Sequence, residues 1–229
     1  MSAATATQAQ PLAYDVGACT ERGLRSYQED AVGHDVGATV SVFAVADGLG
    51  GHPNGDLASR AAVDQVLFAA QAEGPATEVL ARSTVAKAEL SVLATGGSTT
   101  LALLLLTGPR AVVAHVGDSL VYRFRAGVLE QLTAPHRRNR HTLVACLGAS
   151  HPLVSNVPDV REMDTKPGDV WVLATDGVSD TLDEGTIREV LRQVDQDARW
   201  MAEELVRRAL AHGSQDNCTA LVVRVGGAA

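Results

Sequence analysis

Residues 40–52 read Val-Ser-Val-Phe-Ala-Val-Ala-Asp-Gly-Leu-Gly-Gly-His, and this stretch sets the expectations for the fold. Its first part, Val40 to Ala46, is apolar and rich in β-branched residues, which predicts a strand covered on both faces. Its second part is a glycine-rich turn that begins at Asp47-Gly48. A buried strand that ends in such a turn places a carboxylate at the edge of a sheet.

Two further strands are predicted to end in the same way, with an aspartate beside a glycine. A fourth aspartate, Asp216, stands directly before the strand predicted for Asn217 to Val225. A single Asp-Gly pair is typical of an ordinary turn, so each one alone carries little information. The two further strands and their turns are Arg110 to Val116 before Gly117-Asp118-Ser119, and Asp169 to Ala174 before Thr175-Asp176-Gly177.

The four aspartates impose an electrostatic constraint if the strand ends meet in one place. Two unit charges 4 Å apart repel by about 4 kcal/mol at an effective dielectric constant of about 20. The carboxylates would therefore take up protons or bind cations. Oxygen ligands without a cysteine or histidine partner favour Mg²⁺ or Mn²⁺ over zinc.

The segments between these strands predict an α+β fold in one domain, residues 13–229, after a disordered tail at residues 1–12. The helical spacing of Leu57, Ala61, Val66 and Ala70 predicts a helix that begins at Gly55. Residues 134–160 contain three prolines and are expected to form a loop. The remaining predicted helices are 76–93, 184–192 and 198–211, and the remaining predicted strands are 14–20, 98–106, 120–125 and 128–132.

Composition excludes several classes of protein. The formal net charge of −8, from 19 Lys and Arg against 27 Asp and Glu, argues against a nucleic-acid binder. The three cysteines share no short spacing, and their odd number favours a reducing cytoplasm. The start of the chain lacks the pattern of a signal peptide, and the longest apolar run, Leu101 to Leu106, is too short to cross a bilayer. We therefore expect a cytoplasmic monomer with no nucleic-acid or membrane partner.

An ordered series of motifs runs from about Tyr14 to Val225, and with it the chain resembles the bacterial metal-dependent Ser/Thr protein phosphatases of type 2C. The motifs are Arg25-Ser-Tyr-Gln-Glu29-Asp30, Val45-Ala-Asp47-Gly48-Leu-Gly-Gly-His52, Gly97-Ser98-Thr99, His115-Val-Gly-Asp118-Ser119, Gly168-Asp169 with Leu173-Ala-Thr-Asp176-Gly177, and Gly213-Ser-Gln-Asp216-Asn217-Cys-Thr219. The resemblance implies a four-layer α-β-β-α sandwich, in which two antiparallel sheets are flanked by helical pairs. It places the metal ions at one end of that sandwich.

The resemblance also implies a set of metal ligands for two Mn²⁺ or Mg²⁺ ions. Asp47 would bridge the two ions, and the carbonyl group of Gly48 would bind one of them. Asp176 and Asp216 would bind the other. Asp118, together with Asp176, corresponds to a third and weaker site.

Other motif positions correspond to residues that handle substrate and water. Arg25 matches the arginine that binds phosphate, which suits a guanidinium fork facing two phosphate oxygens. His52 matches the histidine proposed as general acid for the leaving oxygen. Glu29 and Asp30 match carboxylates that lie behind the ligands and orient water at the metals, and Asn217 matches a further residue behind the ligands.

The chain departs from the family pattern at several positions. Gln28 replaces an asparagine, Leu120 replaces an arginine, and Pro135 stands where an aspartate is expected. Only Arg137 to Cys146 separates His136 from the following Leu-Gly, where bacterial members carry a longer, mobile flap. The basic window from His136 to His141 is either a solvated loop or a patch that docks acidic phosphopeptides, with Arg137, Arg138 and Arg140 at its rim.

The function implied by the resemblance is hydrolysis of phosphoserine and phosphothreonine in proteins, in opposition to a bacterial Ser/Thr kinase. One alternative is a phosphatase-like regulatory or binding module that has lost turnover. Inactive relatives usually lose an aspartate or the arginine, and this chain keeps all of them. Another alternative is a hydrolase of small phosphate esters.

Overall fold

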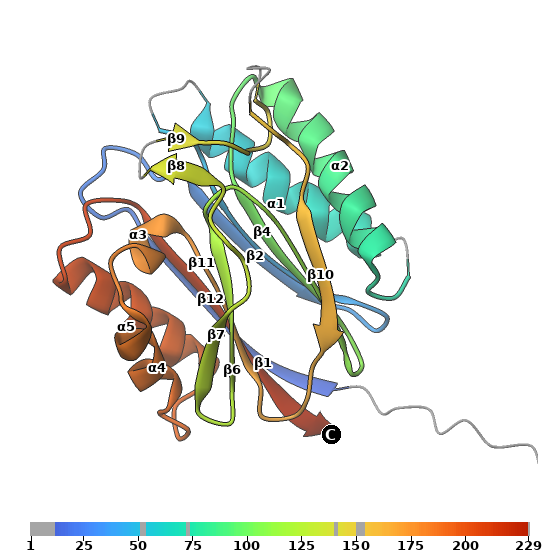
Figure 1. The fold of residues 1–229 in the computed structure, drawn as a ribbon, viewed down its shortest axis with the longest axis vertical. Helices are drawn as coiled ribbons and strands as arrows, with labels where there is room; N and C mark the ends of the chain where they lie inside the picture. Colours follow the sequence, from blue (N-terminus) through green and yellow to red (C-terminus); the bar gives the residue numbers. More distant parts are fainter. Residues whose placement is uncertain (1–11, 51–53, 72–73, 140–141, 150–153, 229) are drawn as a thin grey trace, which may run out of the picture.

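A computed structural model of the chain describes residues 12–50, 54–71, 74–139, 142–149 and 154–228. In these residues, two five-stranded antiparallel sheets lie face to face, and helices cover the outer side of each sheet (Figure 1). This arrangement confirms the predicted sandwich. One sheet has the order β1 (Leu12–Glu21), β12 (Cys218–Ala228), β11 (Val170–Ala174), β6 (Leu120–Arg125) and β7 (Val128–Gln131); the other has the order β10 (Asp159–Asp164), β5 (Arg110–Val116), β4 (Leu101–Thr107), β3 (Ser41–Asp47) and β2 (Asp30–Val36).

The helices divide between the two outer faces. Helices α1 (Gly55–Gln71) and α2 (Glu78–Thr95) cover the sheet that contains β3. Helices α3 (Asp176–Ser179), α4 (Glu184–Leu191) and α5 (Ala198–Ala211) pack on the sheet that contains β12. None of the described helices combines the length and the hydrophobicity that a membrane-spanning segment requires.

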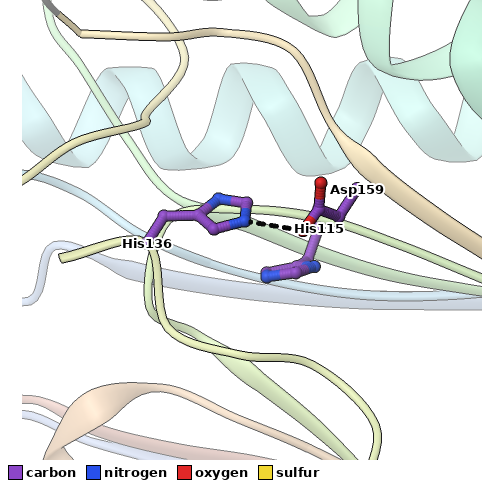
Figure 2. A group of neighbouring side chains, drawn as sticks. All are labelled: His115, His136 and Asp159. Atoms are coloured by element: carbon purple, nitrogen blue, oxygen red, sulfur yellow. Dashed lines mark hydrogen bonds and ion pairs between the residues drawn. The ribbon is translucent and has the colours of Figure 1, made fainter.

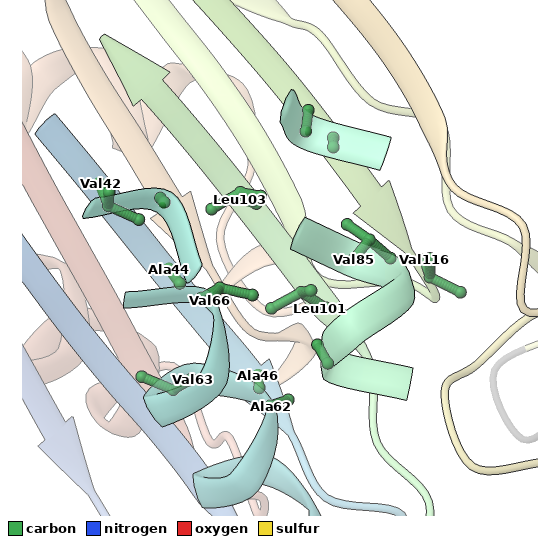
Figure 3. Packing of buried hydrophobic residues seen from close by; sticks show 14 of the residues in the cluster. Val42, Ala44, Ala46, Ala62, Val63, Val66, Val85, Leu101, Leu103 and Val116 are labelled. Atoms are coloured by element: carbon green, nitrogen blue, oxygen red, sulfur yellow. The ribbon is translucent and has the colours of Figure 1, made fainter. Parts of the chain in front are cut away.

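Strand β3 is buried on both faces, as its apolar sequence predicted. Phe43 and Val45 point into the layer between the sheets, where they meet Trp171 of β11. The alternate residues of β3, such as Val42 and Ala44, point to α1 and α2 (Figure 3). Because successive side chains of a strand point to opposite faces, β3 contributes to two hydrophobic cores, one on each side of its sheet.

Helix α1 begins at Gly55 as predicted, and two of the four spaced residues, Val66 and Ala70, are buried. Leu57 is 50% exposed, so its expected place in the buried stripe was wrong. The buried positions are alanines and valines, among them Ala58, Ala62 and Val66. Small side chains let the helix lie close to the sheet, which favours this face over one that carries the larger leucine.

The strands that the sequence did not predict lie at the edges of sheets. Strands β2 and β10 are the two edge strands of the sheet that contains β3; Asp30 is the one buried residue of β2, and β10 has none. The predicted loop at 134–160 also contains the start of β10 and a short hairpin, β8 (Arg137–Asn139) and β9 (Thr142–Leu143). Edge strands bury little surface and tolerate charge, so their sequences lack the apolar run of a central strand.

The layer between the sheets should dominate the stability of the fold. Leu104 of β4 is fully buried there, whereas Leu90 of α2 is 69% exposed. We expect Leu104→Ala to lower the free energy of unfolding by about 2–5 kcal/mol. The matched control Leu90→Ala should change it by less than about 0.5 kcal/mol. Urea unfolding followed by circular dichroism measures both, and equal losses would contradict this account of the core.

Candidate metal centre

The pairing of the strands brings the predicted carboxylates to one end of the sandwich. Asp47 is the last residue of β3, and its register partner is Asp30, the first residue of β2. In the other sheet Leu120 pairs with Ala174, so Asp118 and Asp176 stand two residues beyond the same pair. Ala174 also pairs with Ala220, which follows Asp216 by four residues.

The carboxyl groups at this end interact strongly enough to change their ionisation. Burial, followed by repulsion from Asp30, Asp176, Asp118 and Asp216, raises the pKa of Asp47 well above its ordinary value. Burial raises the pKa of Asp30 to about 7, and burial together with Asp118 and Asp216 raises the pKa of Asp176 to about 6. Without a cation, the group therefore takes up protons at a pH at which ordinary aspartates are ionised.

Two carboxylate oxygens in this group show that it is suited to cations. Asp30 Oδ2 accepts hydrogen bonds from the hydroxyl groups of Thr219 at 2.6 Å and Thr175 at 2.9 Å. Asp30 Oδ1 and Asp176 Oδ1 are buried and find no hydrogen-bond partner in the described part of the chain. Buried, unpartnered carboxylate oxygens beside other carboxylates fit hard divalent ions such as Mg²⁺ and Mn²⁺.

The turn after β3 requires a glycine at position 48. A Cβ atom at Gly48 would collide with the carbonyl group of Gly55 and would lie 2.8 Å from the carbonyl oxygen of Glu29. The backbone N–H of Gly48 donates to that same Glu29 oxygen at 3.0 Å. The absence of a side chain thus lets three backbone segments meet beside Asp47, with the start of α1 among them.

Asn217 ties the segment that carries Arg25 and Glu29 to the start of β12. Its amide nitrogen donates to the carbonyl oxygens of Arg22 at 2.8 Å and Tyr27 at 3.0 Å, and its amide oxygen accepts from the N–H of Glu29 at 2.8 Å. Arg25 completes the link, because its Nη2 donates to Asp216 Oδ2 at 2.7 Å. The Arg25 side chain remains 51% exposed at the rim of the carboxylate group.

Asp118 has a partner that the sequence did not predict. Its Oδ2 lies 3.3 Å from Nη1 of Arg137, and the same guanidinium donates to both carboxylate oxygens of Asp180, each at 2.7 Å. Arg137 was expected at an exposed rim, and this was wrong, since its side chain is only 18% exposed. Arg138, the next residue of β8, is exposed. Arg140 and His52 lie outside the described residues.

A second group of possible metal ligands lies beside the turn Gly117-Asp118 and is held by hydrogen bonds. His115, His136 and Asp159 place ligand atoms within 4.8 Å of one another (Figure 2). The N–H of Gly117 donates to His136 Nδ1 at 3.2 Å, so the neutral ring carries its proton on Nε2 and donates it to Asp159 Oδ2 at 3.1 Å. Both ring nitrogens of His136 are thereby used, and the group braces the turn that leads to Asp118.

Comparison with known proteins agrees with this geometry. The family model for protein phosphatase 2C matches residues 21–212. The chain belongs to the protein phosphatase 2C family. It is 30% identical, over 90% of its length, to the serine/threonine protein phosphatase PstP of Mycobacterium tuberculosis, and it covers 44% of that protein. It is 29% identical, over 89% of its length, to the serine/threonine phosphatase stp of Listeria monocytogenes, and it covers 93% of that protein.

Solved structures of the family share the fold. The catalytic domain of PstP in complex with two manganese ions superposes with a TM-score of 0.80 at 27% identity. That match covers 94% of this chain and all of the other. The present chain thus spans less than half of the M. tuberculosis relative, in a region that aligns with its catalytic domain.

Ionisation in this protein phosphatase 2C domain predicts how the ion-free protein responds to pH. Asp30 and Asp176 have folded-state pKa values of about 7 and about 6, against 3.8 for an unperturbed aspartate. Between these limits the folded state holds more protons than the unfolded state. The contribution of these two groups to stability is therefore full below about pH 4 and falls as the pH rises to about 7, by up to about 1.4 kcal/mol per pH unit for each group.

Urea unfolding in EDTA from pH 4 to 8 measures this slope. We expect Asp176→Asn to make the slope shallower, and we expect Mn²⁺ to restore stability at the upper end. The control Asp195→Asn, an exposed position between α4 and α5, should leave the slope unchanged. A wild-type stability that rises with pH in EDTA would contradict the account of the carboxyl group.

Proposed function

We propose that this chain is a metal-dependent phosphoprotein phosphatase that hydrolyses phosphoserine and phosphothreonine. The observation that carries the proposal is the group of carboxyl groups whose pKa values are raised by burial and by neighbouring carboxylates, with the exposed guanidinium of Arg25 at its rim. The names and the manganese-bound structure of the relatives support it.

Asp47, the carbonyl group of Gly48, Asp176 and Asp216 would hold two Mn²⁺ or Mg²⁺ ions. When bound, such ions lower the pKa of a water molecule that they hold, so that it can lose a proton near neutral pH, and they offset the charge that develops on a phosphoryl group. The protein positions these ligands by its strand register, since Asp47 ends β3 and Asp216 precedes β12.

Arg25 is proposed to bind the phosphate group of the substrate. A guanidinium has five N–H donors, and the contact with Asp216 uses one nitrogen. The remaining donors suit two phosphate oxygens in a bidentate contact. Asn217 supports this role by holding the backbone on both sides of Arg25, at Arg22 and Tyr27.

The proton and water steps are assigned to residues around the ligands. Glu29 and Asp30 are proposed to orient the attacking water, and Asn217 positions Glu29 through its backbone N–H. His52 is proposed to protonate the serine or threonine oxygen as it leaves, because an alkoxide is a poor leaving group. This assignment for His52 rests on its motif position alone.

The proposed substrates are phosphorylated proteins, including a bacterial Ser/Thr kinase and its targets. The relatives are named serine/threonine phosphatases, which supports the substrate class. The odd number of cysteines favours a cytoplasmic location. The expectation that the chain acts as a monomer stays a prediction.

The ions and their shared ligand are tested with Asp47→Asn. Loss of a ligand should lower kcat/KM by more than the roughly 100-fold that loss of a residue behind the ligands costs. Hydrolysis of p-nitrophenyl phosphate and of a phosphothreonine peptide, with and without Mn²⁺, measures this. The control Asp35→Asn lies on β2 opposite Val42, away from the centre, and should keep its activity.

The outcomes of that assay also separate the alternatives. Full wild-type activity after thorough chelation would overturn the metal-dependent mechanism. Mn²⁺ binding without turnover would indicate a regulatory or binding module. Turnover of p-nitrophenyl phosphate without turnover of the peptide would indicate a hydrolase of small esters.

The role of His52 predicts a difference between two substrates. His52→Gln should slow hydrolysis of a phosphothreonine peptide by about 10²–10⁴-fold. It should slow p-nitrophenyl phosphate far less, because nitrophenolate leaves without a proton. Values of kcat for both substrates measure this difference, and equal losses would show that His52 is not the general acid.

A further inference from the structure

Arg137 is the first residue of the short segment 137–146, and its guanidinium lies between the side chains of Asp118 and Asp180. Its guanidinium donates through Nη1 and Nη2 to the two oxygens of Asp180, and Nη1 also lies 3.3 Å from Asp118 Oδ2. The Asp118 side chain is 7% exposed and that of Arg137 is 18% exposed. The arrangement is a partly buried ion pair in which one cation serves two carboxylates.

Arg137 is held in this place from several sides. Its neighbour His136 accepts a hydrogen bond from Gly117 N–H, donates to Asp159, and donates its own backbone N–H to the carbonyl oxygen of Gly117 at 2.9 Å. Asp180 in turn donates its backbone N–H to the carbonyl oxygen of Asp176 at 2.8 Å. The guanidinium is therefore fixed against both the strand end that carries Asp118 and the helix that begins at Asp176.

A fixed guanidinium at this position competes with a metal ion for Asp118. An ion about 2.1 Å from Asp118 Oδ2, the usual Mg²⁺–oxygen distance, would lie at most about 5.4 Å from Nη1, given the 3.3 Å contact. Arginine stays charged at every pH at which proteins are folded, so this repulsion cannot be relieved by loss of a proton. Asp118 already has a cation 3.3 Å from one of its oxygens.

We propose that Arg137 is the resident counterion of Asp118 and takes the place of the third metal ion that the family resemblance implies. The inference rests on the proposed two-ion centre formed by Asp47, Asp176 and Asp216. It makes Arg137 a positioning residue and removes Asp118 from the set of ligands. The protein then binds two divalent ions where the resemblance implies three.

The number of bound Mn²⁺ ions tests this directly. Equilibrium dialysis with manganese determination, supported by the electron paramagnetic resonance signal of free Mn²⁺, should give two ions per wild-type chain up to millimolar Mn²⁺. Arg137→Met should add a third, weaker ion, and the double variant Arg137→Met/Asp118→Asn should return to two. Arg137→Lys keeps a cation near Asp118 and should also stay at two.

Two controls separate this result from a general loss of structure. Arg138→Met, at the exposed neighbouring position of β8, should bind two ions. Asp118→Asn in the otherwise wild-type chain should bind two ions as well, because Asp118 is not a ligand there. Circular dichroism and the melting temperature establish that each variant is folded.

The outcomes that overturn the inference differ from those that overturn the function. Three ions in the wild type, with one lost in Asp118→Asn, would show that Asp118 binds metal despite Arg137. A folded Arg137→Met that still binds two ions would show that Arg137 does not exclude the third. Either result leaves the two-ion phosphatase intact, whereas fewer than two ions in the wild type would refute that centre and this inference with it.

Discussion

The repulsion between carboxyl groups at one end of the sandwich is the constraint on which the rest of this structure depends. Burial opposes the ionisation of Asp47, Asp30 and Asp176, and the charge of neighbouring carboxylates adds to that effect. The protein relieves part of it with donors, since two threonine hydroxyl groups face Asp30 and Arg25 faces Asp216. What remains is a demand for positive charge, and that demand is the basis of ion binding.

The rigid sheets make this constraint possible. A carboxylate can be kept among others only if its backbone cannot move away, and Asp47 sits on a strand that is buried on both faces. Thr100 Oγ1 accepts from the N–H of Asp47, and the carbonyl oxygen of Asp47 accepts from the N–H of Thr100, both at 2.9 Å. The two cores on either side of β3 therefore supply the free energy that keeps the centre assembled without its ions.

The sequence predicts well what depends on local pattern and poorly what depends on pairing at a distance. The strand at 40–46, the helix at 198–211 and the aspartates at the strand ends follow from periodicity and turn residues, and the structure has them in place. Strand β2 escapes prediction because an edge strand needs no apolar run. Arg137 and Asp180 are 43 positions apart, and Arg137 reaches Asp180 from a short hairpin that the local sequence pattern does not predict. From the sequence alone, Arg137 was therefore assigned to an exposed basic window.

A fixed cation and an exchangeable one satisfy the same carboxylate with different consequences. A bound ion depends on its free concentration, whereas the guanidinium of Arg137 is present whenever the hairpin β8–β9 is folded. Helix α3 begins at Asp176, and its C-terminal neighbour Asp180 is the second partner of Arg137. The cation that neutralises Asp118 therefore also holds the far end of the helix that carries a ligand. In this chain Arg137 acts on the centre from within the fold, through one side chain, whereas the side chain of Arg25 at the rim is 51% exposed.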